Sequence, residues 1–240
     1  MIQIAISNES TVIPDNDVLA CLAALQIQVN RDFAPLWGIS AQLSFLPKGQ
    51  STSGWQLIVF DTSDQADALG YHELTSTGQP LGKIFAKSDI QAGTSWTVTA
   101  SHELLEMLVD PWINLTAESD GQDGSITLYA YECSDAVEAD ALGYKIGDVL
   151  VSDFVLPAWF QPLVPGPYSF RKSVTAPFQL APGGYISILQ AGSGVGWQQV
   201  TAQLGRRGLM SLAPGGPDAP QGSRRQRRLI PDANWRRSER

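Results

Sequence analysis

The sequence predicts an α+β fold followed by an irregular C-terminal arm, and three observations support that prediction. Short segments of alternating or apolar residues are typical of strands, and two longer segments have the apolar spacing of helices. Beyond Gly205 the composition changes to Pro, Gly, Ser and Arg, as in a tail. Apolar residues make up 43% of the 240 positions, which excludes a chain without a core.

The predicted strands are short, and turn-forming residues separate them. They cover residues 2–6, 41–46, 55–60, 70–74, 83–86 and 126–132, with a hairpin of 144–146 and 149–154. The pair Gly147-Asp148 is the turn of that hairpin. The stretch 156–200 is rich in Pro, Gly and aromatic residues, so it predicts short strands at most.

Two helices are predicted. Apolar residues at helical spacing over 16–34, preceded by a Pro-Asp start signal, predict an amphipathic helix. A second helix is predicted over 95–109. It is expected to end near Asp110, because Pro111 disfavours helical backbone at the residue before it.

The charge of −8 is unevenly distributed along the chain. Residues 1–204 contain 7 basic and 21 acidic residues and carry −14, whereas residues 206–240 contain nine Arg and three acids and carry +6. This change of charge near residue 205 predicts one domain over 1–204 and a basic arm over 205–240. An acidic body of this kind repels nucleic acid and anionic membranes.

The arm contains the run Ser-Arg-Arg-Gln-Arg-Arg at 223–228. It could bind nucleic acid, but no aromatic ladder accompanies it, which argues against that partner. It could also dock on an acidic partner or on the chain's own acidic body, be a site of proteolysis, or be a solvated tail. The residues leave these alternatives open.

The N-terminus and the hydropathy predict where the protein resides. No apolar run is long enough to cross a bilayer, and the first residues lack the features of a secretory signal. We expect a cytoplasmic protein, with phage association or non-classical export as alternatives. The two cysteines, Cys21 and Cys133, are too few for a disulfide framework and predict buried thiols, with a metal contact by Cys133 as the minor alternative.

The helix predicted over 95–109 has a polar stripe on an otherwise apolar surface. His102, Glu103 and Glu106 share one face with Thr99, and Asp110 extends it. Burying these groups costs several kcal/mol unless something compensates them, and the helix contains no Lys or Arg. A bound cation is the simplest compensation; hydrogen bonds or salt bridges to basic residues elsewhere are the structural alternative.

The spacing assigns a role to each residue of the stripe. His102 and Glu106 are one turn apart and can grip one metal, while Glu103 points to the flank and can reach a metal-bound water. This is the arrangement of the H-E-x-x-H motif, with Glu106 in place of the second His. The metal lowers the pKa of its water, and Glu103 is the catalytic base.

Further ligands must come from outside the helix. Glu132, at the end of a predicted strand, is the expected third ligand. Asp135 is expected either as a fourth ligand or as a residue that orients one. Asp110 lies too far along the helix axis for the same ion and is expected to orient a ligand. A solvated acidic loop is the alternative for 131–138.

The run TASHELLEMLVDP, followed by Glu132-x-x-Asp135 with a nearby Cys, resembles the H-E-x-x-E motif of zincin-like metallopeptidases. That group includes the plant EXORDIUM/phosphate-induced family and uncharacterised bacterial proteins. The resemblance covers about residues 95–140. It implies a mixed sheet, an active-site helix below it and a substrate cleft along the edge strand, with His102 and Glu106 as ligands, Glu103 as base, and Glu132 with Asp135 as the downstream acidic element.

Two departures from the known patterns affect these roles. In the family pattern the Cys follows the Asp, whereas here Cys133 follows the Glu. An acidic second ligand makes the metal a weaker Lewis acid and shifts preference from zinc toward calcium or manganese. Zinc is the predicted ion, with calcium or manganese as alternatives.

The only other histidine is His72, in Gly-Tyr-His-Glu at 70–73. If the strand pair 71–86 forms the sheet edge beside the helix, His72 or Tyr71 could stabilise a substrate oxyanion, with His72 as the predicted second catalytic residue. An exposed or capping His is the alternative.

The sequence therefore predicts a metal-dependent, zinc peptidase that acts on a peptide or protein. The alternative is a non-catalytic binding or assembly protein that keeps a structural ion and contacts a partner through its Arg-rich arm.

Overall fold

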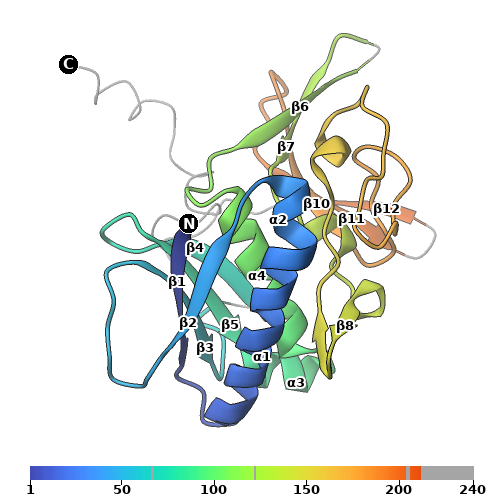
Figure 1. Cartoon of the computed structure of the whole chain (residues 1–240). Helices are drawn as coiled ribbons and strands as arrows, with labels where there is room; N and C mark the ends of the chain where they lie inside the picture. The colour runs from blue at the N-terminus through green and yellow to red at the C-terminus, as the bar shows by residue number, and fades with distance from the viewer. Residues whose placement is uncertain (66–67, 122, 204–205, 212–240) are drawn as a thin grey trace.

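The first half of the chain forms a five-stranded mixed sheet in the order β2-β1-β3-β5-β4 (Figure 1). Its strands are β1 (Ile2–Asn8), β2 (Ala41–Leu46), β3 (Trp55–Phe60), β4 (Gly70–Leu74) and β5 (Pro80–Phe85). The first four in sheet order are parallel, and β4 alone runs antiparallel to its neighbour, at the edge. The computed structural model describes residues 1–65, 68–121, 123–203 and 206–211.

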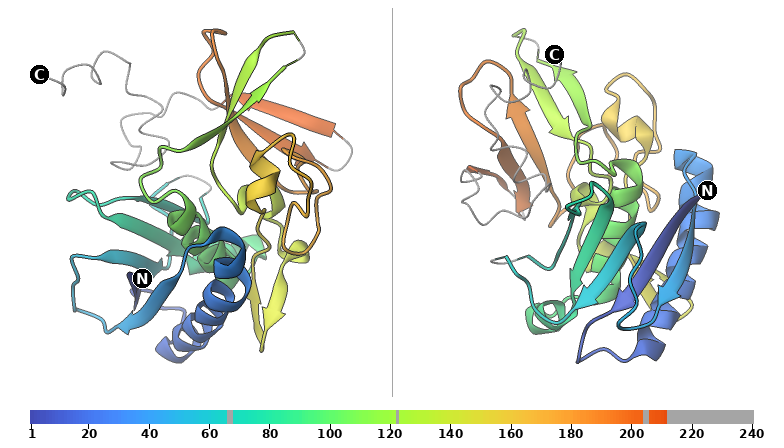
Figure 2. Two further views of the ribbon diagram at one scale, coloured as in Figure 1. Left: turned by 45° about the horizontal axis from the view of Figure 1, so that its top comes forward. Right: turned by 90° about the vertical axis from the view of Figure 1, so that its left-hand side faces the viewer.

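Two long helices cover one face of this sheet (Figures 1 and 2). The first, α1 (Asp15–Ile27), continues through a π-helical segment, η1 (Gln28–Phe33), into α2 (Ala34–Trp37). It ends at Gly38, whose φ of 70° suits a residue without a Cβ. The predicted helix over 16–34 is confirmed in position, although the π-helical segment within it was not predicted.

The second long helix, α4 (Trp96–Val109), carries the polar stripe. Its residues from Val98 onward are buried, with Thr99 half-buried, because the helix lies between the sheet and the second half of the chain. It ends before Asp110, as the position of Pro111 predicts. A short helix that was not predicted, α3 (Ala86–Ala92), precedes it and begins where β5 ends.

The second half of the chain forms an antiparallel sheet in the order β12-β11-β10-β7-β6. Its strands are β6 (Thr116–Asp120), β7 (Ile126–Ala130), β10 (Tyr185–Gln190), β11 (Gln198–Gln203) and β12 (Arg206–Ser211). The prediction of an irregular arm from residue 205 is wrong at its start, because 206–211 pair with β11. The remainder of the predicted arm, 212–240, lies outside the described residues.

The predicted hairpin is confirmed as β8 (Tyr144–Ile146) and β9 (Val149–Val151), which is shorter than predicted. Three short 3-10 turns complete the fold: η2 (Asp135–Val137), η3 (Asp140–Leu142) and η4 (Pro157–Phe160). Phe160, from the Pro-rich stretch, packs against Trp37 and Tyr131, and the buried Trp159 packs against Phe160, so both extend the core between the two halves.

Among the described residues, the mixture of helices and three sheets confirms the predicted α+β class. Within the described part of the chain, no helix is both long and apolar enough to cross a membrane.

Candidate metal centre

Four titratable side chains gather where α4 passes the edge strand β4 and the turn η2. His102, Glu103 and Glu106 come from the middle of α4, and Asp135 begins η2. Each is at least nine-tenths buried. The helical spacing places the three α4 residues toward the same side, as the sequence predicts.

The first group within this cluster consists of His102, Glu106 and Asp135. The His102 Nε2 atom lies 3.1 Å from Asp135 Oδ1 and 3.3 Å from Glu106 Oε2. Ligand atoms on one tetrahedral zinc ion, at bonds of about 2.0–2.1 Å, are separated by about 3.3 Å. The three side chains therefore have the spacing of ligands to a common ion.

Backbone amides fix the orientation of Glu106. Its Oε1 atom accepts hydrogen bonds from the N–H groups of Ser134, at 3.0 Å, and Asp135, at 3.2 Å. Oε2 is thereby turned toward the imidazoles. The same contact ties the start of η2 to α4, so it also positions Asp135 beside His102.

The second group consists of His72, Glu103 and Glu106. The Nδ1 atom of His72 lies 3.2 Å from Glu103 Oε2 and 3.9 Å from Glu106 Oε2. His72 is buried, and its Nε2 atom has no hydrogen-bond partner among the described residues. The alternative of an exposed histidine is thus wrong, and the contact with Glu103 was not predicted.

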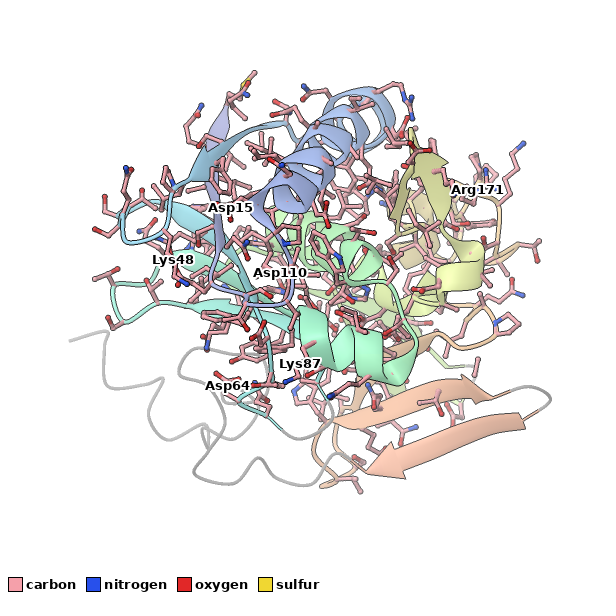
Figure 3. The ribbon with its side chains drawn as sticks, turned by 90° about the horizontal axis from the view of Figure 1, so that it is seen from below. Asp15, Lys48, Asp64, Lys87, Asp110 and Arg171 are labelled. Atoms are coloured by element: carbon pink, nitrogen blue, oxygen red, sulfur yellow. The ribbon has the colours of Figure 1, made fainter. Side chains whose placement is uncertain are left out.

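Five carboxylates lie in or beside the cluster, because Glu132 and Glu138 adjoin the three already named. Among the described side chains, Glu103, Glu106 and Asp135 form ion pairs only with the two histidines. The seven Lys and Arg residues of 1–204 lie elsewhere: three pair with other acids and four are exposed. Figure 3 shows Lys48 and Arg171 toward opposite sides of the molecule.

Without a cation, protons must compensate this negative charge. Burial lowers the pKa of His102, but the charge of Glu106 and the hydrogen bond to Asp135 outweigh it and raise that pKa well above its usual value. Burial and the charge of Glu106 raise the pKa of Asp135. Burial also raises the pKa of Glu138 to about 7. A group of acids with raised pKa values beside imidazoles is typical of a functional site.

A cavity of about 620 Å³ opens on the cluster. Its wall includes Gly70, Thr99, His102, Glu103, Glu138 and Tyr185. A Cβ atom at Gly70 would lie 2.5 Å from a methyl carbon of Thr99 and 3.1 Å from Glu103, so only glycine fits there without displacing them. The cavity lies between the start of edge strand β4 and helix α4, and both His102 and Glu103 are accessible from it.

Tyr185 is a site residue that the sequence analysis missed. It lies on β10, which reaches the cavity only through long-range strand pairing. Burial raises its pKa well above the usual value, and the charges of Asp135 and Glu138 add to that shift. No local spacing links this residue to the α4 motif, so the sequence contained no signal for it.

Two of the predicted site residues, Glu132 and Asp110, lie outside both groups of potential ligands. Glu132 lies beyond the end of β7 and is buried, but its carboxylate belongs to neither group of potential ligands, although its charge raises the pKa of His72. Asp110 is buried and accepts hydrogen bonds from the N–H groups of Asn114 and Leu115, both at 3.0 Å. It thus holds the loop between α4 and β6.

Both cysteines are buried and free, as predicted. The Sγ atom of Cys133 lies 3.7 Å from the Ser134 hydroxyl. Cys133 belongs to neither group of potential ligands, so the structure offers no support for a metal contact by its thiol.

Asp89, on α3, gives a test of the electrostatics beside the cavity. It is fully buried; Oδ1 accepts hydrogen bonds from Thr94 and Thr99, and Oδ2 has no partner among the described residues. Burial raises its pKa from 3.8 to about 6. The neutral form therefore stabilises the fold below pH 3.8, and this contribution is lost as pH rises through 6.

Asp89→Asn is expected to remove this decrease in folding stability with rising pH, which amounts to at most about 3 kcal/mol. Denaturant unfolding at pH 4 and pH 8 measures it: the decrease in stability between the two should be smaller in Asp89→Asn than in the wild type. Asp148→Asn, at an exposed turn, is the control. An unchanged difference for Asp89→Asn would contradict the assignment.

No protein family, no curated protein and no solved structure matches the chain.

Proposed function

We propose that the chain is a metal-dependent hydrolase of zincin type that cleaves peptide bonds in a peptide or protein substrate. The observation that carries this proposal is the buried group of His102, Glu106 and Asp135, at ligand spacing, beside Glu103 on the wall of a cavity.

The donor set fits a divalent transition-metal ion. One imidazole nitrogen and two carboxylate oxygens suit zinc or manganese better than calcium, which prefers oxygen ligands alone. Asp135 Oδ2 is buried without a hydrogen-bond partner among the described residues, so the carboxylate has capacity left for a cation. Zinc is the proposed ion, with manganese and then calcium as the alternatives.

The architecture agrees with what the resemblance of residues 95–140 implies. The first sheet is mixed, its antiparallel edge strand is β4, and α4 packs on its face. The cavity begins at Gly70, the first residue of β4. These features support a zincin-like fold with a substrate cleft at the edge strand.

The chain's own residues then have distinct tasks. A divalent ion held by His102, Glu106 and Asp135 would supply Lewis acidity and lower the pKa of a water toward about 7. Glu103, on the cavity wall beside these residues, would serve as the general base. His72 holds Glu103 through the contact between Nδ1 and Oε2. His72 is therefore proposed to position the base rather than to stabilise an oxyanion.

Tyr185 is the better candidate for stabilising charge on the substrate. Its phenol lies on the same cavity wall as His102 and Glu103, and a hydroxyl donor stabilises a carbonyl oxygen that gains negative charge. Burial keeps the phenol protonated near neutral pH, because it raises the pKa well above the usual value.

A non-catalytic binding or assembly protein is the second candidate, and Glu106 is the observation that favours it. A carboxylate in place of the second imidazole weakens the Lewis acidity of the ion. Such a protein would keep the ion for stability and contact a partner elsewhere. The Arg-rich run 223–228, which could make that contact, lies outside the described residues.

The metal content of purified protein tests the proposal. We expect about one tightly held zinc per chain after dialysis. Asp135→Asn should weaken binding by more than about 100-fold, because it removes a direct ligand. Asp140→Asn is the matched control, since Asp140 lines the same cavity outside the ligand group. A wild-type protein without metal after metal-replete purification would end the proposal, and bound metal without hydrolysis of any peptide would favour the second candidate.

A further inference from the structure

We propose that His72, Glu103 and Glu106 form a second, weaker cation site that shares Glu106 with the first site and inhibits hydrolysis when it is filled. The inhibitory effect rests on the proposed function, whereas the site itself rests on geometry. The ligand would be a second divalent transition-metal ion, such as zinc or manganese.

Glu106 belongs to both groups of potential ligands. Its Oε1 atom is engaged by the backbone N–H groups of Ser134 and Asp135, so Oε2 alone faces the two imidazoles. Oε2 lies 3.3 Å from His102 Nε2 and 3.9 Å from His72 Nδ1. A carboxylate oxygen within reach of two imidazole nitrogens is suited to bridge a pair of ions about 3.5–4 Å apart.

His72 is directed into this second group. Its ring makes polar contacts with Glu103 and Glu106 through Nδ1, and its Nε2 atom has no hydrogen-bond partner among the described residues. Nδ1 can bind an ion only in the neutral imidazole that carries its proton on Nε2. In that form the lone pair of Nδ1 is available to an ion shared with Glu103 and Glu106.

The charge of the cluster also favours two ions. With neutral imidazoles, the carboxylates of Glu103, Glu106, Glu132, Asp135 and Glu138 contribute five negative charges when ionised. One divalent ion leaves three of them uncompensated, and a second leaves one. Because four of these side chains are buried and Glu138 is half-buried, this residual charge attracts a further cation more strongly than it would in water.

Occupancy of the second site would prevent Glu103 from acting as the general base. Glu103 would use Oε2 as a ligand, and its contact with His72 would be replaced by bonds of both residues to the ion. A carboxylate bound to a cation is a poor proton acceptor, so hydrolysis should fall as the second ion binds. Glu103 is on the cavity wall, which gives the ion a route of entry.

Equilibrium dialysis against increasing free zinc, with elemental analysis, tests the site without reference to activity. We expect one ion per chain at low zinc and two at high zinc. His72→Gln should bind one ion throughout. Glu73→Gln, on the neighbouring residue of β4 that pairs with Lys83, is the control and should still bind two. With manganese, the two-ion form should give the electron paramagnetic resonance signal of a spin-coupled pair, absent in His72→Gln.

The outcomes separate this inference from the proposed function. A wild-type protein that saturates at one ion, or a His72→Gln variant that still binds two, overturns the second site. If two ions bind as expected but no peptide is cleaved, the second site stands and the proposed function fails. With an active enzyme, hydrolysis should rise with the first ion and fall at least tenfold with the second; a plateau would overturn the inhibitory role.

Discussion

Replacing Glu103 by Gln is expected to lower kcat for peptide hydrolysis by about 10²- to 10⁴-fold, the usual contribution of a general base. The amide cannot accept the proton, whereas the ligand group of His102, Glu106 and Asp135 does not include this side chain. The first ion should therefore remain bound. Steady-state kinetics together with the metal content of the same samples measures both effects.

Glu118→Gln, on the exposed face of β6, is the control for the loss of a carboxylate and should match the wild type in rate and metal content. Retained hydrolysis in Glu103→Gln would remove the base from the proposed mechanism. Loss of the first ion in that variant would instead show that Glu103 is a ligand.

Gly184→Ala is expected to destabilise the fold by about 3 kcal/mol and to weaken metal binding. A Cβ atom at this position would overlap the backbone carbonyl of Ala136, which cannot rotate away as a side chain can. Ala136 lies in η2 directly after Asp135, so relief of the overlap must move the segment that supplies a ligand. Denaturant unfolding and a zinc titration of the variant test the two effects.

Gly196→Ala is the matched control, because a Cβ atom there meets nothing within 4 Å. It should change the free energy of unfolding by no more than about 0.5 kcal/mol. An unfolding midpoint for Gly184→Ala equal to that of the control would show that η2 shifts at little cost.

Much of the first half of the fold could be predicted, because its signals are local. The apolar period of α4 and the proline after it define the helix and its end. The strands β1, β2 and β3 have patterns that hold within six or seven residues. The strands β10, β11 and β12 were not predicted. β10 pairs with β7, which lies far earlier in the chain, and β11 and β12 extend the sheet from β10, so none of the three depends on a local pattern alone.

The residues of the candidate site also fall into those that local spacing predicts and those that depend on the tertiary structure. Helical spacing alone places His102, Glu103 and Glu106 together. The choice between Glu132 and Asp135 required the structure, because β7 ends at Ala130 and the chain then turns into η2. The contact of His72 with Glu103 depends on which strand forms the sheet edge, and a linear pattern does not determine that.

The two backbone N–H groups that hold Glu106 have a consequence for how the protein tolerates genetic change. A hydrogen bond donated by a side chain disappears with most substitutions of that residue, but a peptide N–H is lost only when proline is introduced. The orientation of Glu106 therefore does not depend on which side chain stands at position 134, provided that the replacement fits the buried position of Ser134. Sequence drift at this position can proceed under steric constraint alone, while the glutamate that it holds must remain.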